Sequence, residues 1–123
     1  MVVLRGEVDW ADLSPVLGSE QGGLRPVLVV QADPIHRHAS TTIVLALTSR
    51  PQRAGHPRTV ALEAGEDGMT RASWVKVNQL RTVALGRLRG RLGMLGDDRR
   101  REVDRALVEV LRLGDAAAAI ASQ

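Results

Sequence analysis

The chain has 123 residues, enough for one domain with a single hydrophobic core and too few for two domains of ordinary size. Its 44% hydrophobic and 25% charged residues are typical of a soluble globular protein, and no apolar run approaches the length of a membrane-spanning helix. It contains no cysteine, which excludes disulfides and thiolate metal sites, and no secretory signal is visible, so we expect a cytoplasmic protein.

The net charge of +3 conceals a strong bias in the basic residues, because Lys76 is the only lysine among 17 of them. The planar guanidinium of arginine suits bidentate binding of phosphate, which points to an anionic partner. A codon bias towards arginine is the better explanation for the number of arginines. Only their positions therefore carry information about function.

Strands dominate most of the chain. Alternating or continuous apolar residues predict six of them, over residues 5–10, 27–30, 42–47, 59–62, 73–77 and 87–92. The segments between them are polar or rich in glycine and proline, the most prominent being a long loop over residues 13–24. Many short strands with polar turns favour a small barrel or sandwich.

One helix is expected near the C-terminus. Its apolar residues recur at helical spacing and are Val103, Ala106, Leu107, Val110 and Leu111. Asp97 or Asp98 is expected to cap its start, and Gly114 to end it. The alanine-rich residues 115–123 either fray or continue this helix.

Residues 18–31 (GSEQGGLRPVLVVQ) form the most informative segment of the chain. A glycine-rich loop carries Glu20 and delivers Arg25 to the start of an apolar strand, where Pro26 keeps Arg25 extended. Binding and catalytic residues concentrate in loops that a rigid scaffold positions. The segment lacks the Gly-Lys-Ser/Thr end of a P-loop, so we expect no nucleoside triphosphate site.

Four blocks of the sequence resemble the MazF/PemK/Kid family of toxin endoribonucleases. They are residues 5–13 (RGEVDWADL), 18–31, 45–49 (LALTS) and 77–83 (VNQLRTV), and they stand in the family's order. The resemblance implies an α+β, mostly β fold: a small antiparallel SH3-like barrel with a C-terminal helix. It also implies a single toxin domain over residues 1–123, with its core at about 5–113 and a C-terminal tail at 114–123.

The function that the resemblance implies is sequence-specific, metal-independent cleavage of single-stranded RNA, chiefly mRNA. The RNA 2′-hydroxyl is the nucleophile, and the products carry 2′,3′-cyclic phosphate and 5′-hydroxyl ends. Such an enzyme inhibits translation and growth as the toxin of a toxin–antitoxin pair. The resemblance further implies no cofactor, a homodimer, and a cognate acidic antitoxin that covers the RNA groove.

Two alternative functions stay open at this point. The related CcdB-type toxins have the same fold and poison DNA gyrase without any RNA chemistry. A barrel that binds RNA without cutting it is the second alternative. Fold alone does not choose among these functions, because small barrels host many activities.

The resemblance implies that Arg25 and Thr48 are catalytic, and Glu20 is a third catalytic candidate because of its place in the glycine-rich loop. Attack by the 2′-hydroxyl builds negative charge on a five-coordinate phosphorus, which a fixed guanidinium at Arg25 stabilises. Thr48 is expected to orient the scissile phosphate, although a hydroxyl at that position also caps turns. Glu20, ionised at neutral pH, either accepts the 2′-hydroxyl proton, or holds Arg25 in place, or simply keeps its loop soluble.

The predicted RNA-binding residues are Ser49, Lys76, Asn78 and Gln79, which lie in or beside blocks that resemble the family, together with Trp74. Trp74, Lys76 and Asn78 alternate along one predicted strand and share a face. Trp74 is suited to stack on an unpaired base, but tryptophan more often fills a core or an interface. The family often has an acid where this chain has Asn78, and an amide cannot act as a base. This departure moves the role of base to Glu20 or to water.

Two further groups of residues have a weaker claim to function. Three arginines share one face of the last predicted strand and are expected to be solvated, or alternatively to contact phosphates: Arg87, Arg89 and Arg91. Three histidines lie in polar segments without an obvious acidic ligand and are expected at the surface: His36, His38 and His56. We therefore expect no metal site.

Overall fold

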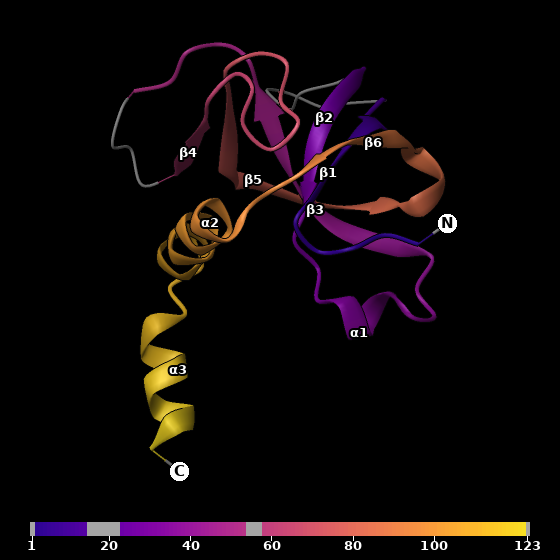
Figure 1. Ribbon diagram of the computed structural model, residues 1–123. Helices are drawn as coiled ribbons and strands as arrows, with labels where there is room; N and C mark the ends of the chain where they lie inside the picture. Colours follow the sequence, from indigo (N-terminus) through magenta and orange to yellow (C-terminus); the bar gives the residue numbers. More distant parts are fainter. Residues whose placement is uncertain (1, 15–22, 54–57, 123) are drawn as a thin grey trace.

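The computed structural model describes residues 2–14, 23–53 and 58–122 and is shown in Figure 1. Its strands are β1 (Glu7–Asp12), β2 (Leu24–Val29), β3 (Thr41–Thr48), β4 (Thr59–Leu62), β5 (Ser73–Ala84) and β6 (Leu88–Met94). Its helical segments are α1 (Asp33–His36), the 3-10 turn η1 (Leu85–Arg87), α2 (Asp97–Val110) and α3 (Gly114–Ala121). Within these residues the strands form one antiparallel sheet in the order β4-β5-β3-β2-β1-β6, which confirms the predicted mostly β, α+β fold. No described helix is long and apolar enough to cross a membrane.

The sheet is buried on both faces. Because successive side chains of a strand point to opposite faces, Leu28 enters one core while Val27 and Val29 enter the other. The first core lies beneath α2, which contributes Val103 and Ala106 to it and packs beside β4 and β5 (Figure 1). Its other buried members are Val8, Leu45, Leu47, Val60, Leu62, Met69, Val75, Val77 and Leu95. The second core consists of Val3, Ala11, Leu13, Val27, Val29, Val44, Val83 and Leu88.

β5 is much longer than the predicted strand over residues 73–77. It has 12 residues and pairs along the whole of β3, with one irregularity at residues 77–79. The pairs on either side of the irregularity are Ala46 with Lys76 and Leu45 with Leu80. The extra residues find no partner of their own on β3, as in a β-bulge, and a bulged strand bends at that point. Asn78 and Gln79 therefore lie in a bend within the strand.

α2 begins after Gly96, which occupies the N-cap position and has no side chain with which to cap the helix. The carboxylate of Asp67 accepts the Gly96 N–H at 3.0 Å. The predicted caps, Asp97 and Asp98, were wrong, because both residues lie inside the first turn. There they suit the positive end of the helix dipole. Their ion-pair partners are Arg100 and Arg101, at 2.7 and 2.6 Å respectively.

The end of α2 also differs from the prediction, because Gly114 does not stop the helix but begins α3. The stop is made by Arg112, which adopts a left-handed backbone with φ of 54°. Arg112 donates its N–H to the Glu109 carbonyl at 3.2 Å, and Leu113 donates to the Val108 carbonyl at 2.8 Å. This pair of bonds is a Schellman motif, whose left-handed residue is usually glycine.

The alanine-rich C-terminal segment forms α3, a helix separate from α2. It therefore neither frays nor continues the preceding helix, the two outcomes that the sequence left open. Figure 1 shows it leading away from the sheet, and none of its residues whose burial is described belongs to either core.

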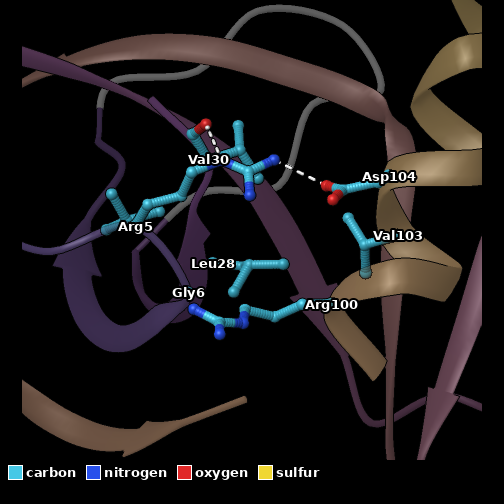
Figure 2. Close-up of a pocket in the computed structure, with 8 residues that line it drawn as sticks. Arg5, Gly6, Leu28, Val30, Arg100, Val103 and Asp104 are labelled. Atoms are coloured by element: carbon cyan, nitrogen blue, oxygen red, sulfur yellow. Dashed lines mark hydrogen bonds and ion pairs between the residues drawn. The ribbon is translucent and has the colours of Figure 1, made fainter. Parts of the chain in front are cut away.

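Arg5 joins the N-terminal segment, the sheet and α2 (Figure 2). Its Nε donates to the Val30 carbonyl at 2.9 Å, and its Nη2 lies 2.6 Å from the carboxylate of Asp104 on α2. Its backbone N–H donates to Asp33 of α1 at 2.6 Å. Arg5 belongs to a turn before β1, so the expected strand over residues 5–10 begins two residues too early.

The loop between β4 and β5 approaches β6 so closely that two glycines are required. A Cβ at Gly68, whose φ is 89°, would lie 2.7 Å from the Leu92 carbonyl oxygen. A Cβ at Gly93 would lie only 2.0 Å from the carbonyl oxygen of Asp67. Met94 donates its N–H to the same Asp67 oxygen at 3.2 Å. The close contact fixes the loop against the edge of the sheet.

Gly93→Ala should lower the free energy of unfolding by roughly 1–3 kcal/mol, because its Cβ overlaps a backbone oxygen and the chain must shift. Urea unfolding followed by circular dichroism measures the change. Gly86→Ala is the matched control, since a Cβ at Gly86 meets no described atom within 4 Å, and it should stay within about 0.5 kcal/mol of the wild type. Equal stabilities for the two variants would contradict the close approach.

Candidate functional site

The strand register places Arg25, Thr48 and Trp74 in one row across β2, β3 and β5. Val27 of β2 pairs with Ala46 of β3, and continuing this register by two residues sets Arg25 opposite Thr48. Thr48 in turn pairs with Trp74. Cross-strand partners project to the same face of a sheet. The three side chains therefore share one face at the end of the sheet where β2 begins and β3 ends.

Lys76 and Asn78 continue this region along β5. Lys76 follows Trp74 at the alternating position and is half-buried, whereas Asn78 is exposed. The simple alternation that predicted a shared face for Asn78 does not extend through the irregularity at residues 77–79. Lys76 and Asn78 nevertheless line one hollow together.

Thr48 is half-buried at the end of β3, and its hydroxyl oxygen accepts the N–H of Arg50 at 3.1 Å. The hydroxyl thus closes the turn after β3, which is the structural role that a threonine at this position often has. Its proton is still available for donation, because a hydroxyl has one donor in addition to its acceptor lone pairs. Arg25 is exposed at the start of β2.

Two hollows open beside this row of residues. The Arg25 hollow has a volume of about 400 Å³, and its lining includes Trp10, Arg25, Ser49, Met69, Arg71 and Leu92. The Lys76 hollow has a volume of about 230 Å³ and is lined by Gln52, Arg53, Arg58, Thr59, Lys76 and Asn78. Thr48, Trp74 and Gln79 line neither hollow.

The charge at both hollows is positive. No aspartate or glutamate is among the described residues that line them. The described residues also give no acidic ion-pair partner to Lys76, Arg53 or Arg71. A concave surface lined by one sign of charge concentrates ligands of the opposite sign. The arrangement therefore suits an anionic polymer.

Several lining residues were missed by the sequence analysis. Arg71 and Met69 come from the loop before β5, while Arg53 and Arg58 belong to the segment between β3 and β4. The available signal was the clustering of arginines in loops next to the strands that carry Thr48 and Lys76. That signal was discounted because arginine is abundant throughout the chain.

Glu20 and the glycine-rich loop around it lie outside the described residues, as does His56. The prediction of a surface position was wrong for His36, whose side chain is only 8% exposed. Its Nε2 lies 2.7 Å from the hydroxyl of Thr42, so His36 supports the fold. His38 is exposed. The described residues contain no group of three or more potential metal ligands.

The predicted row of arginines near β6 is only partly a strand face. Arg87 belongs to η1 and donates to the backbone carbonyl of Asp12 at 3.1 Å, which holds the end of β1. Arg89 lies 3.9 Å from the Asp12 carboxylate. Arg91 is opposite Asp9 of β1. These partners indicate that the three side chains organise the sheet edge instead of forming an open row of phosphate contacts.

Two carboxyl groups are buried together on β1, the neighbour of the strand that carries Arg25. Glu7 and Asp9 are 5% and 4% exposed, and they share the face of the second core. The pKa of Asp9 is raised to about 7, chiefly by burial and further by the hydrogen bond and charge of Glu7, against an opposing effect of Arg91. The two acids at alternate positions of an apolar strand were the signal for this pair, and the sequence analysis missed it.

The raised pKa of Asp9 predicts a stability that falls as the pH rises. Between about pH 4 and pH 7 the folded protein keeps a proton that the unfolded chain has released, so the free energy of unfolding falls by about 1.4 kcal/mol for each pH unit. Asp9→Asn should remove this slope. Urea unfolding at several pH values within this window measures it, and the exposed Asp115→Asn is the control. A wild-type slope that survives in Asp9→Asn would contradict the assignment.

Comparison with known proteins bears on the whole domain. A family model described as the PemK-like, MazF-like toxin of type II toxin–antitoxin systems matches residues 4–111. The chain is 45% identical over 115 residues to Endoribonuclease EndoA of Bacillus subtilis (strain 168). These 115 residues cover 94% of this chain and 99% of EndoA.

Solved structures show the same architecture. The crystal structure of MazF (Form-I) from Deinococcus radiodurans matches with a TM-score of 0.75 at 27% identity. The match covers 90% of this chain and 97% of the Deinococcus chain. An endoribonuclease in complex with its cognate antitoxin from a mycobacterial species has a TM-score of 0.74 at 26% identity. That match covers 90% of this chain and 96% of the other.

Proposed function

The chain belongs to the PemK-like, MazF-like toxins of type II toxin–antitoxin systems, and on this premise we propose that it is a toxin endoribonuclease acting on mRNA in the cytoplasm. The reaction is sequence-specific cleavage of single-stranded RNA, which inhibits translation and growth. EndoA, nearly half identical along almost its full length, is an endoribonuclease, and this supports the same activity here.

The observation that carries the proposal is the place of Arg25 and Thr48 on neighbouring strands. They stand opposite each other when the register of Val27 with Ala46 is continued by two residues. On this continued register the guanidinium of Arg25 and the hydroxyl of Thr48 share one face of the sheet. Arg25 also lines a cationic hollow, which Thr48 does not line. A phosphodiester placed there has a fixed positive charge and a hydrogen-bond donor within reach of its non-bridging oxygens. Both groups are held by strands, so neither needs to reorganise during the reaction.

The RNA supplies its own nucleophile, and this chemistry requires no metal-activated water. The 2′-oxygen bonds to phosphorus, the bond from phosphorus to the 5′-oxygen breaks, and the 2′-hydroxyl proton passes to a base. The leaving 5′-oxygen takes up a proton from solvent. Arg25 stabilises the charge that develops on the five-coordinate phosphorus, and Thr48 orients the group for in-line attack. The products carry 2′,3′-cyclic phosphate and 5′-hydroxyl ends.

Glu20 is our proposed base, with water as the alternative. It precedes Arg25 by five residues on the segment that leads into β2. Asn78 does not take this role, because an amide has no basic site at neutral pH. No cofactor takes part in the proposed reaction.

The proposed partners are single-stranded RNA and a cognate acidic antitoxin, and the acting form is a homodimer. One of the similar solved structures is an endoribonuclease in complex with its cognate antitoxin, which supports the second partner. The cationic lining of both hollows supports competition between an acidic peptide and RNA for one surface.

Arg25→Ala should slow RNA cleavage on the order of 10²- to 10³-fold, because it removes the charge that stabilises the transition state. The assay is single-turnover cleavage of a long mRNA in excess EDTA, with a DNA copy that should stay intact. Arg25→Lys should recover only part of the rate, since an ammonium cannot reproduce the planar fork. Arg37→Ala, at an exposed position after α1, is the control and should cut normally.

Near wild-type cleavage by Arg25→Ala would sink the catalytic role of this residue. A wild-type protein that cuts no RNA would overturn the proposed function. Inhibition of DNA gyrase would then identify the gyrase-poison alternative, and RNA binding without cleavage would identify the binding-barrel alternative.

Thr48→Val keeps the shape of the side chain and removes its hydroxyl. If Thr48 orients the phosphate, single-turnover cleavage should fall about tenfold or more, while affinity for RNA falls less. The Arg50 N–H, left without its partner, is exposed to water, so the stability loss should stay below about 1 kcal/mol. A large stability loss with unchanged cleavage per folded molecule would show that Thr48 only closes the turn.

A further inference from the structure

We infer that the Lys76 hollow holds one nucleotide of the RNA next to the cleaved bond, and that Asn78 reads the base of this nucleotide as adenine. The inference rests on the proposed function and adds a specificity-determining residue to it. Its basis is the shape, the charge and the hydrogen-bonding capacity of the hollow.

The shape of the hollow follows from strand pairing. Thr59 of β4 pairs with Lys76 of β5, and the Val77 N–H donates to the Arg58 carbonyl at 2.8 Å. These contacts hold one wall at the start of β4. The bend at residues 77–79 forms the other side and carries Asn78 out of the regular ladder. The volume of about 230 Å³ suits a single base with its phosphate and is small for a drug-sized ligand.

The charge of the hollow identifies the ligand as anionic. Arg53, Arg58 and Lys76 contribute to the lining, and no described lining residue is acidic. Lys76 is half-buried and has no acidic partner among the described residues. A half-buried cation without an acid nearby is a favourable contact for a phosphate. This charge fixes the backbone of the nucleotide but does not select its base.

Selection requires a polar group that is free to turn towards a base edge, and Asn78 provides it. Its side chain is exposed and receives no hydrogen bond from the part of the chain that the structure describes. Gln52, the other amide of the hollow, already donates its Nε2 to the Arg50 carbonyl at 2.9 Å. A carboxamide offers an acceptor and a donor side by side, which matches the N6 and N7 atoms of adenine.

The position of the hollow places this base near the cleaved bond. Thr48 pairs with Trp74, and Lys76 lies two residues beyond Trp74 on β5. The spacing between strands and the rise per residue together put Lys76 about 8 Å from Thr48. This distance corresponds to a nucleotide directly flanking the phosphate that Arg25 and Thr48 would hold. Asn78 thus has a direct role in recognition at a position where an acid would instead accept a proton.

The test uses a pool of RNA oligonucleotides with randomised positions, cleaved by the wild type and its variants and sequenced from the new ends. The wild type should favour adenine roughly tenfold or more at one position beside the cut. Asn78→Asp should shift that position towards cytosine, whose N4 amino group a carboxylate accepts, and Asn78→Ala should lose the preference. Thr82→Asp, an exposed position farther along β5, adds the same charge and should keep the wild-type motif.

The inference is overturned if the wild type and all Asn78 variants cut at the same motif, or if the preferred base at the affected position is not adenine. A second arm separates this failure from failure of catalysis, by selecting the same pool for binding to Arg25→Ala protein. Suppose that the wild type cuts no RNA, but that Arg25→Ala protein enriches adenine and loses this enrichment when Asn78 is also replaced. That result would support the proposed nucleotide site and overturn only the proposed chemistry. Neither cleavage nor enrichment would overturn both.

Discussion

The register between β2 and β3 is the constraint on which the rest of the site depends. Slipping β2 by one residue would turn Arg25 to the opposite face and away from Thr48. Burial alone does not prevent the slip, because both faces of these strands are apolar. Side-chain size prevents the slip. On β2 and β3, Leu28 and Leu45 fill the core under α2, whereas the smaller Val27, Val29 and Val44 fill the other core. Exchanging them would overpack one core and leave cavities in the other.

A second constraint acts through β5, which serves two parts of the molecule. Its first half pairs with both β3 and β4, and its second half pairs with β3 alone. The irregularity at residues 77–79 lets the two halves of β5 run in different directions, because a bulged strand bends where a regular ladder stays straight. One strand can therefore pair with β4 in its first half and still follow β3 in its second. The same bend exposes Asn78 beside Lys76. A feature that curves the sheet thus also shapes a binding surface.

Much of this arrangement could be predicted from the sequence, for identifiable reasons. The apolar runs around Leu28 and Leu45 specify strands buried on both faces, and the spacing around Val103 specifies a helix. The long second half of β5 was missed because Val83 is its only buried residue, so it has no apolar face to recognise. The helix ends were misplaced because the residues concerned act through tertiary contacts: Asp67 reaches Gly96 across 29 positions, a contact that no local pattern reveals.

The distribution of arginines separates structure from function better than their number does. On α2, Arg99, Arg100 and Arg101 each pair with an acid three residues away, and Arg99 also reaches Glu66. Such pairs neutralise charge locally and contribute little to long-range attraction. Arg53, Arg71 and Lys76 have no such acid among the described residues, so their field extends into the hollows. A codon bias accounts for how many arginines there are. It does not account for acids accompanying them on α2 while no described residue that lines the two hollows is acidic.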